Sequence, residues 1–131
     1  MALKTILVED SETIRNNLIP TLAEMANVHV IAVAESESKA ATAFDQHKQV
    51  WELAIVDLFL KEGSGLGVVR AQRSRLASQH VLVLTNYSTP EVRRRCLELG
   101  ADGVFDKSTE LEAFFDLCKI YGAPEPGAGE R

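Results

Sequence analysis

The chain has 131 residues, of which 46% are hydrophobic and 25% charged, and its formal net charge is −5. This length allows one domain with a substantial core, and the negative charge disfavours nonspecific binding to nucleic acid or to a membrane surface. No apolar run is long enough to span a membrane and no signal peptide is apparent at the N-terminus, so we expect a cytoplasmic protein.

Strand and helix patterns alternate along the chain. Short aliphatic runs such as Ile6-Leu7-Val8 are typical of strands buried on both faces, and apolar residues between the runs recur at helical spacing. The predicted strands lie near residues 4–9, 28–33, 53–57, 80–85 and 103–105, and the predicted helices near 12–25, 36–48, 64–76, 89–99 and 109–121. This order predicts an α/β fold of the (βα)5 type, a doubly wound parallel sheet with helices on both faces.

Several residues indicate where the helices begin and end. Ser36, Thr109 and the pair Thr89-Pro90 are typical N-terminal caps. Gly100 follows a helical pattern as a C-terminal glycine, and Pro20 predicts a kink or an early break in the first helix. The Pro- and Gly-rich segment 122–131 is expected to be a flexible tail after a single domain at 1–121, with no second domain behind it.

Polar residues close four of the predicted strands. Glu9 and Asp10 follow the first strand, Asp57 the third and Thr85 the fourth, and Lys107 follows the last one. Because the C-terminal ends of parallel strands meet at one edge of the sheet, these side chains should share one cleft. Three acids, a hydroxyl and a cation suit a divalent metal ion together with a transferable phosphoryl group.

Each of these residues has a predicted role. Asp10 and Asp57 would bind Mg²⁺ or Mn²⁺ directly, Glu9 directly or through water, and Asp57 would also act as the nucleophile that becomes an aspartyl phosphate. Thr85 and Lys107 would contact the phosphoryl oxygens. Without metal the three carboxylates repel one another, which should raise the proton affinity of at least one of them.

From about residue 3 to residue 121 the chain resembles the receiver domains of bacterial two-component response regulators. The segments that carry the resemblance are Glu9-Asp10, Asp57-Leu58-Phe59-Leu60, Gly63-Ser64-Gly65-Leu66, Thr85, and Gly100-Ala101-Asp102-Gly103 with Lys107. The resemblance implies the flavodoxin-like strand order 2-1-3-4-5. It also implies Asp57 as phosphoacceptor, the backbone carbonyl of Phe59 as a metal ligand, and a sensor histidine kinase or histidine phosphotransfer protein as phosphodonor.

The chain departs from the usual receiver pattern in several places. Lys61 and Ser108 stand where many receivers have proline, and Asn86 stands where a small residue is usual. Val104 occupies the position of an aromatic switch residue; Phe105 follows it, and strand alternation should point Phe105 to the opposite face. Three residues beside the site are expected to restrict access to the phosphoryl group, namely Phe59, Asn86 and Tyr87.

Two further signals have simple interpretations. Gly63-Ser64-Gly65-Leu66-Gly67 lacks the lysine of a phosphate-binding P-loop and predicts a permissive turn into the third helix. The run Arg93-Arg94-Arg95 is either a solvated helix face or a docking patch for an acidic partner.

The leading functional hypothesis is a stand-alone phosphoacceptor in a phosphorelay, with at most slow self-dephosphorylation. It would signal by binding an unknown downstream protein or by onward transfer, without direct contact with nucleic acid or membrane. One alternative is a haloacid-dehalogenase-type phosphatase, but such enzymes need a second acid at the position of Phe59. The other is a degenerate receiver that binds partners without phosphorylation; the intact acids, Thr85 and Lys107 argue against it.

Overall fold

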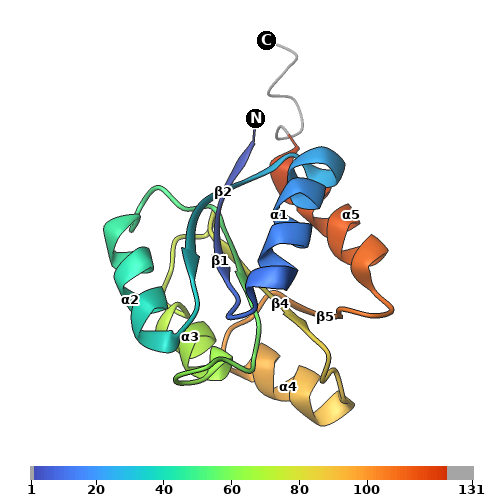
Figure 1. Ribbon diagram of the computed structural model, residues 1–131. Coiled ribbons are helices and arrows are strands. Elements are labelled where there is room, and N and C mark those ends of the chain that lie inside the picture. Colours follow the sequence, from blue (N-terminus) through green and yellow to red (C-terminus); the bar gives the residue numbers. More distant parts are fainter. Residues whose placement is uncertain (1, 124–131) are drawn as a thin grey trace.

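A parallel sheet with strand order β2-β1-β3-β4-β5 forms the centre of the molecule (Figure 1). The computed structural model describes residues 2–123. The strands are β1 (Leu3–Val8), β2 (Val28–Ala34), β3 (Leu53–Val56), β4 (His80–Thr85) and β5 (Gly103–Asp106). The helices are α1 (Glu12–Ala26), α2 (Glu37–Gln46), α3 (Gly65–Ala71), α4 (Pro90–Glu98) and α5 (Leu111–Gly122). The predicted (βα)5 fold and its flavodoxin-like strand order are therefore confirmed.

Two apolar cores flank the sheet because the central strands are buried on both faces, as the aliphatic runs predict. Every residue of β3 is buried. On one face Phe44, Val69 and Cys96 bring α2, α3 and α4 onto the sheet, and on the other face Leu22 and Phe114 bring α1 and α5 (Figure 1). Among residues 2–123, no helix has both the length and the apolar character needed to cross a membrane.

The predicted caps of α2 and α4 are confirmed. The side chain of Ser36 accepts a hydrogen bond from the backbone N–H of Lys39, and that of Thr89 from the N–H of Val92. Gly100 follows α4 with φ of 111°, a left-handed conformation that glycine adopts without a steric penalty.

The predicted cap at Thr109 is wrong. Helix α5 begins at Leu111, and its first flanking residue, Glu110, makes no capping bond with its side chain. The backbone N–H of Thr109 instead donates to Asp106 Oδ1. The loop before α5 is therefore organised by Asp106.

Two further predicted helix boundaries change, and the break considered for the first helix does not occur. Helix α1 continues through Pro20 to Ala26, with Leu22 and Ala26 buried in the core beyond the proline; of the predicted kink or early break, the early break is therefore wrong. Helix α3 ends at Ala71 and not near 76, since the guanidinium of Arg75 donates to the carbonyls of Gln72 and Gln79 and holds that segment in turns. Helix α5 includes Gly122, and the rest of the predicted tail, from residue 124, lies outside the described residues.

Candidate functional site

Three carboxylates meet at the C-terminal edge of the sheet. Glu9 and Asp10 follow β1, and Asp57 follows β3. One oxygen from each carboxylate lies within 4.8 Å of the others. The backbone fixes two of them in place, since the N–H of Glu9 donates to Ala34 and that of Asp57 donates to Val8. The acids that the sequence predicts to share a cleft are thus brought together.

Lys107 supplies the positive charge of this cluster. Its Nζ atom lies 2.7 Å from Glu9 Oε1 and 3.4 Å from Asp57 Oδ2. The backbone N–H of Lys107 donates to the carbonyl of Thr85 at 2.9 Å, which ties the end of β5 to the end of β4. The lysine therefore bridges two of the three acids and lies beside the carboxylate of Asp57.

Burial and charge together shift the ionisation of Glu9. Its side chain is almost wholly buried, and burial is the main reason that its pKa is raised above the ordinary value for glutamate. The hydrogen bond from Lys107 opposes this rise, while the charge of Asp57 adds to it. The predicted increase in proton affinity of one acid is confirmed, but desolvation contributes more than repulsion.

The donors at this edge fit a divalent metal ion. Mg²⁺ and Mn²⁺ prefer hard oxygen ligands, and three carboxylates this close together carry more negative charge than Lys107 alone balances. Phe59 lies two residues beyond Asp57, and its backbone pairs with Ser64 in an isolated antiparallel bridge. The residues present therefore fit the predicted metal.

Thr85 lies at the end of β4 and is fully buried. Its Oγ1 atom accepts a hydrogen bond from the backbone N–H of Tyr87 at 3.1 Å. A hydroxyl that accepts one bond still has a proton to donate. Asn86, the next residue, accepts a weak hydrogen bond from Ser108 and, with Lys107, lines a groove of about 410 Å³ between α1 and α5.

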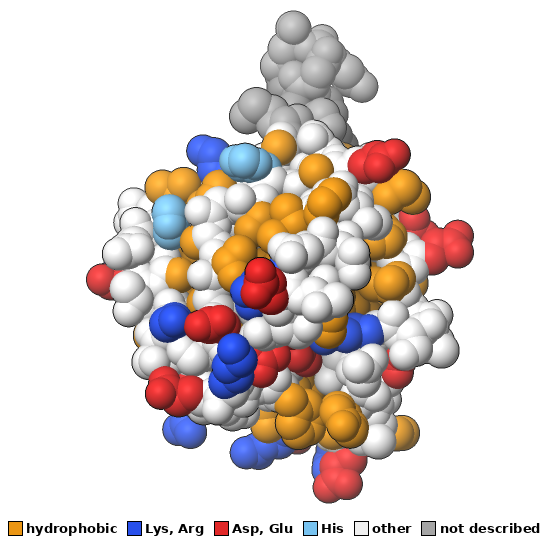
Figure 2. All heavy atoms as spheres, viewed as in Figure 1, with side chains coloured by type: hydrophobic (Ala, Val, Ile, Leu, Met, Phe, Trp, Pro, Cys, Tyr) orange, Lys and Arg blue, Asp and Glu red, His pale blue; other side chains and the backbone are white. Residues whose placement is uncertain are grey.

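Two aromatic residues lie two positions beyond residues of the candidate site, Phe59 after Asp57 and Tyr87 after Thr85. The rings of Phe59 and Tyr87 lie with their centroids 4.4 Å apart and their planes at 55°, although the two side chains come from different loops. Phe59 is 58% exposed and Tyr87 57% exposed. Figure 2 shows hydrophobic side chains gathered next to acidic ones at the end of the molecule where α4 lies. The pair is therefore an exposed contact between the β3–α3 and β4–α4 loops.

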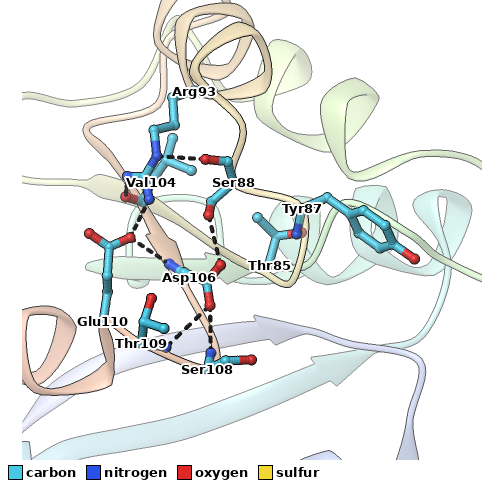
Figure 3. A network of polar contacts seen from close by, with 9 residues as sticks. All are labelled: Thr85, Tyr87, Ser88, Arg93, Val104, Asp106, Ser108, Thr109 and Glu110. Carbon is cyan, nitrogen blue, oxygen red and sulfur yellow. Dashed lines mark hydrogen bonds and ion pairs between the residues drawn. The ribbon is translucent and has the colours of Figure 1, made fainter.

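A polar network that the sequence did not indicate links the β4–α4 loop, α4 and the β5–α5 loop (Figure 3). Ser88 Oγ donates to Asp106 Oδ2 at 2.7 Å, and the backbone N–H of Ser108 donates to Asp106 Oδ1 at 2.7 Å. The hydrogen bond from Ser88 is the largest cause of a pKa of Asp106 below the ordinary aspartate value. The ring of Tyr87 points away from this network in Figure 3.

Arg93 completes the network. Its guanidinium donates to the backbone carbonyls of Ser88 and Val104 at 2.9 Å each and pairs with the carboxylate of Glu110, which also accepts from the N–H of Asp106. The hydrogen bond from Arg93 is the main cause of a lowered pKa of Glu110. Arg93 thus belongs to a structural network, whereas Arg94 and Arg95 are exposed.

The last strand confirms the predicted orientation of its two apolar residues. Val104 is buried in the core under α2, α3 and α4. Phe105 packs on the opposite face, where its ring meets Phe114 edge-on at 5.7 Å. Val104 is thus a short aliphatic side chain inside the core, and its backbone carbonyl accepts a hydrogen bond from Arg93.

Comparison with known proteins agrees with this architecture. Residues 5–119 match the family model of the response regulator receiver domain. The chain is 28% identical over 120 residues to the DNA-binding transcriptional activator DevR/DosR of Mycobacterium tuberculosis, covering 92% of this chain and 54% of that protein. It is 32% identical over 110 residues to the two-component response regulator PhoP of Pseudomonas aeruginosa, covering 84% of this chain and 47% of that protein. The chain thus spans about half the length of these relatives.

Solved structures show the same fold. A DNA-binding response regulator of the LuxR family from Staphylococcus aureus superposes with a TM-score of 0.80 at 15% identity, covering 92% of this chain and 99% of that one. The signal receiver domain of a DNA-binding response regulator from Colwellia psychrerythraea superposes with a TM-score of 0.78 at 19% identity, covering 90% and 96%.

Proposed function

The chain belongs to the response regulator receiver domain family, and we propose that Asp57 accepts a phosphoryl group from a histidine kinase or a histidine phosphotransfer protein. The observation that carries this proposal is the meeting of Glu9, Asp10 and Asp57 within 4.8 Å, with the ammonium group of Lys107 3.4 Å from Asp57. Asp57 directly follows a central strand in which every residue is buried, and its backbone N–H donates to the carbonyl of Val8.

The transfer itself needs a nucleophile and groups that balance charge. A carboxylate oxygen of Asp57 attacks phosphorus, the bond from phosphorus to the donor imidazole nitrogen breaks, and the imidazole leaves with that electron pair. Lys107 then moves from its contact with Glu9 toward a phosphoryl oxygen, and the Thr85 hydroxyl donates to another. Mg²⁺ or Mn²⁺, held by Asp10, Asp57, the Phe59 carbonyl and Glu9 directly or through water, would neutralise charge on the phosphoryl oxygens.

The site favours a phosphoacceptor over a phosphatase. The residue two positions after Asp57 is Phe59, which offers no acid to protonate a leaving group and turns its ring to Tyr87. We further propose that these two rings and Asn86 limit the approach of water, so that the aspartyl phosphate hydrolyses slowly. A degenerate receiver is disfavoured because Glu9, Asp57 and Lys107 form a connected charge cluster.

The output that we propose is contact with another protein, or onward transfer of the phosphoryl group. The β4–α4 loop and α4 are the elements that would carry the signal, since Thr85 is joined to Tyr87 and the following Ser88 is held by Asp106. The relatives named above include DNA-binding regulators. We propose an output through protein contacts, without direct binding of this chain to nucleic acid or membrane. The cytoplasmic location expected from the sequence stays a prediction.

Incubation with a small phosphodonor such as acetyl phosphate and Mg²⁺ tests the function. We expect one phosphoryl group for each chain, released slowly. Rapid multiple turnover of phosphate esters would instead indicate a phosphatase, and no labelling under any donor would indicate a binding module.

A further inference from the structure

Glu37, at the first position of α2, contacts the glycine-rich segment Gly63-Ser64-Gly65-Leu66-Gly67 that leads into α3. Its Oε1 atom accepts a hydrogen bond from the backbone N–H of Ser64 at 2.8 Å. Its own backbone N–H donates to the carbonyl of Glu62 at 3.0 Å. Glu37 therefore binds this loop through side chain and backbone, on either side of Gly63.

The glycines make room for this carboxylate. A Cβ atom at Gly67 would lie 2.4 Å from Glu37 Oε2, and one at Gly63 would lie 2.3 Å from Glu37 Cβ. Gly63 also has φ of 79°, a conformation that side chains rarely adopt. The segment is the turn that the sequence predicts, and its glycines also enclose the side chain of Glu37.

The anchored residue Ser64 is joined directly to the candidate site. Ser64 pairs with Phe59 in an antiparallel bridge, and the N–H of Gly65 donates to the carbonyl of Leu58 at 3.0 Å. Segment 57–59 carries both Asp57 and the backbone carbonyl of Phe59. A continuous path of hydrogen bonds and backbone pairing therefore runs from the Glu37 carboxylate to the candidate metal ligand.

We propose that Glu37 is a positioning residue that holds the β3–α3 loop so that the Phe59 carbonyl faces the metal. This inference rests on the proposed function, because it assumes that Mg²⁺ binds beside Asp57. Groups that orient a metal ligand without touching the metal typically change metal affinity by about 10-fold or more when they are removed.

The experiment compares Glu37→Ala, Glu37→Gln and Gly67→Ala with the wild type. Mg²⁺ affinity is measured by NMR titration of backbone amides, and hydrogen exchange of the Ser64 amide is measured without metal. We expect Glu37→Ala to bind Mg²⁺ about 10-fold more weakly and to expose the Ser64 amide. Glu37→Gln keeps an acceptor oxygen and should stay close to wild type in both measurements. Glu112→Ala, which removes an exposed first-turn acid from α5, is the control for lost helix charge and should change neither.

Gly67→Ala tests the contact without deleting Glu37. The added methyl group pushes the carboxylate away from its place, so Mg²⁺ binding should weaken, whereas in the Glu37→Ala background it should cause no further loss. This variant and Glu37→Gln also carry the test if Glu37→Ala does not fold.

The outcomes separate this inference from the proposed function. A wild-type protein that does not bind Mg²⁺ overturns both. Wild-type binding with full affinity in Glu37→Ala overturns only the role of Glu37. Equal losses in Glu37→Ala and Glu37→Gln also overturn it, because they would show that the negative charge acts and not the hydrogen bond. If the double variant loses Mg²⁺ affinity by the product of the factors for Gly67→Ala and Glu37→Ala, the two substitutions act independently, and this result would also overturn the role of Glu37.

Discussion

The ammonium group of Lys107 lies 2.7 Å from the carboxylate of Glu9, a side chain that is only 3% exposed. Removing one partner of a buried pair leaves the other without compensation for its lost hydration. Lys107→Ala should therefore lower the free energy of unfolding by about 1–3 kcal/mol in the absence of metal. Added Mg²⁺ should restore part of that loss, because it replaces the ammonium group as the counter-charge of the carboxylates and so binds the variant more tightly than the wild type.

Urea unfolding with and without Mg²⁺ measures this effect. Lys119→Ala is the matched control, since Lys119 pairs with Asp116 at 4.0 Å on the surface and such pairs contribute about 0–1 kcal/mol. A second variant, Lys107→Ala with Glu9→Gln, should recover stability because it removes the buried charge. Equal effects of the two lysine substitutions would show that the Lys107–Glu9 pair is not stabilising.

Asp57 should form an acyl phosphate that is stable in acid and labile in base, and only when a divalent metal is present. The three carboxylates repel an incoming phosphoryl group unless their charge is balanced. Asp57→Asn should abolish labelling by radioactive acetyl phosphate, because the nucleophile and a metal-ligand charge are both lost. Full labelling of this variant, or of the wild type in excess chelator, would contradict the assignment.

Trp51 should respond weakly to metal. It is 2% exposed, packs edge-on against Phe44, and precedes β3, whereas Asp57 follows that strand. Six residues of extended chain separate two points by about 20 Å. Titration with Mg²⁺ should thus leave the emission of Trp51 nearly unchanged, while urea unfolding, the positive control, changes it strongly. Strong quenching by Mg²⁺ in the folded protein would show that the metal acts on the opposite end of the sheet.

Strand-end residues were predictable because the geometry of parallel strands determines where they go. Glu9, Asp57 and Thr85 each follow an aliphatic run, and such runs specify both the strand and its burial. The alternation of Val104 and Phe105 follows from the same local rule, and it needs no knowledge of the neighbouring elements.

The rest depends on contacts between distant segments. Arg93 and Glu110 are both charged residues on or beside helices, where exposure to solvent is the usual outcome, and only the packing of α4 beside β5 pairs them. Likewise, nothing near Gly67 in the sequence indicates a carboxylate from residue 37. The boundary of α3 was missed because a side chain, Arg75, holds the turns that follow it.

The aromatic pair should lengthen the life of the phosphorylated state. Phe59 and Tyr87 contact each other across two loops, so removing either ring opens the approach to Asp57. We expect an aspartyl phosphate half-life of minutes or longer in the wild type and faster hydrolysis in Phe59→Ala and Tyr87→Ala.

Asn86→Ala should also speed exchange of the phosphoryl group with solvent or small donors. Loss of radioactive phosphate over time measures each rate, and Leu97→Ala, which removes another exposed apolar side chain, is the control. A wild-type half-life of seconds that none of these changes alters would refute the shielding.

The pKa of Asp106 depends on the position of the β4–α4 loop in the unphosphorylated protein. Its pKa lies below the ordinary value chiefly because Ser88 donates a hydrogen bond to it. A lowered pKa means that the folded state favours the ionised form, so this contribution to stability is present above the ordinary aspartate pKa and is lost as pH falls through the lowered one. Ser88→Ala should therefore raise the pKa of Asp106 and reduce the loss of stability in acid.

Phosphorylation should change the same pKa. The backbone N–H of Tyr87 donates a hydrogen bond to the Thr85 hydroxyl. If Thr85 moves toward the phosphoryl group, we therefore expect Tyr87 and the adjacent Ser88 to shift with it. Val104 is short, β-branched and buried, so it has no large rotameric change to offer as a readout. We expect a phosphoryl mimic such as beryllofluoride to break the contact between Ser88 and Asp106. The pKa of Asp106 should then rise toward its value in Ser88→Ala, and the NMR signals of the backbone amides of residues 86–95 should shift. Carboxyl ¹³C NMR titration with and without the mimic measures this, and the control is Asp57→Asn, in which the mimic should have no effect. An unchanged Asp106 pKa and fixed 86–95 signals, with rearrangement around Val104 and Phe105, would show that the signal leaves through β5 and not through the loop before α4.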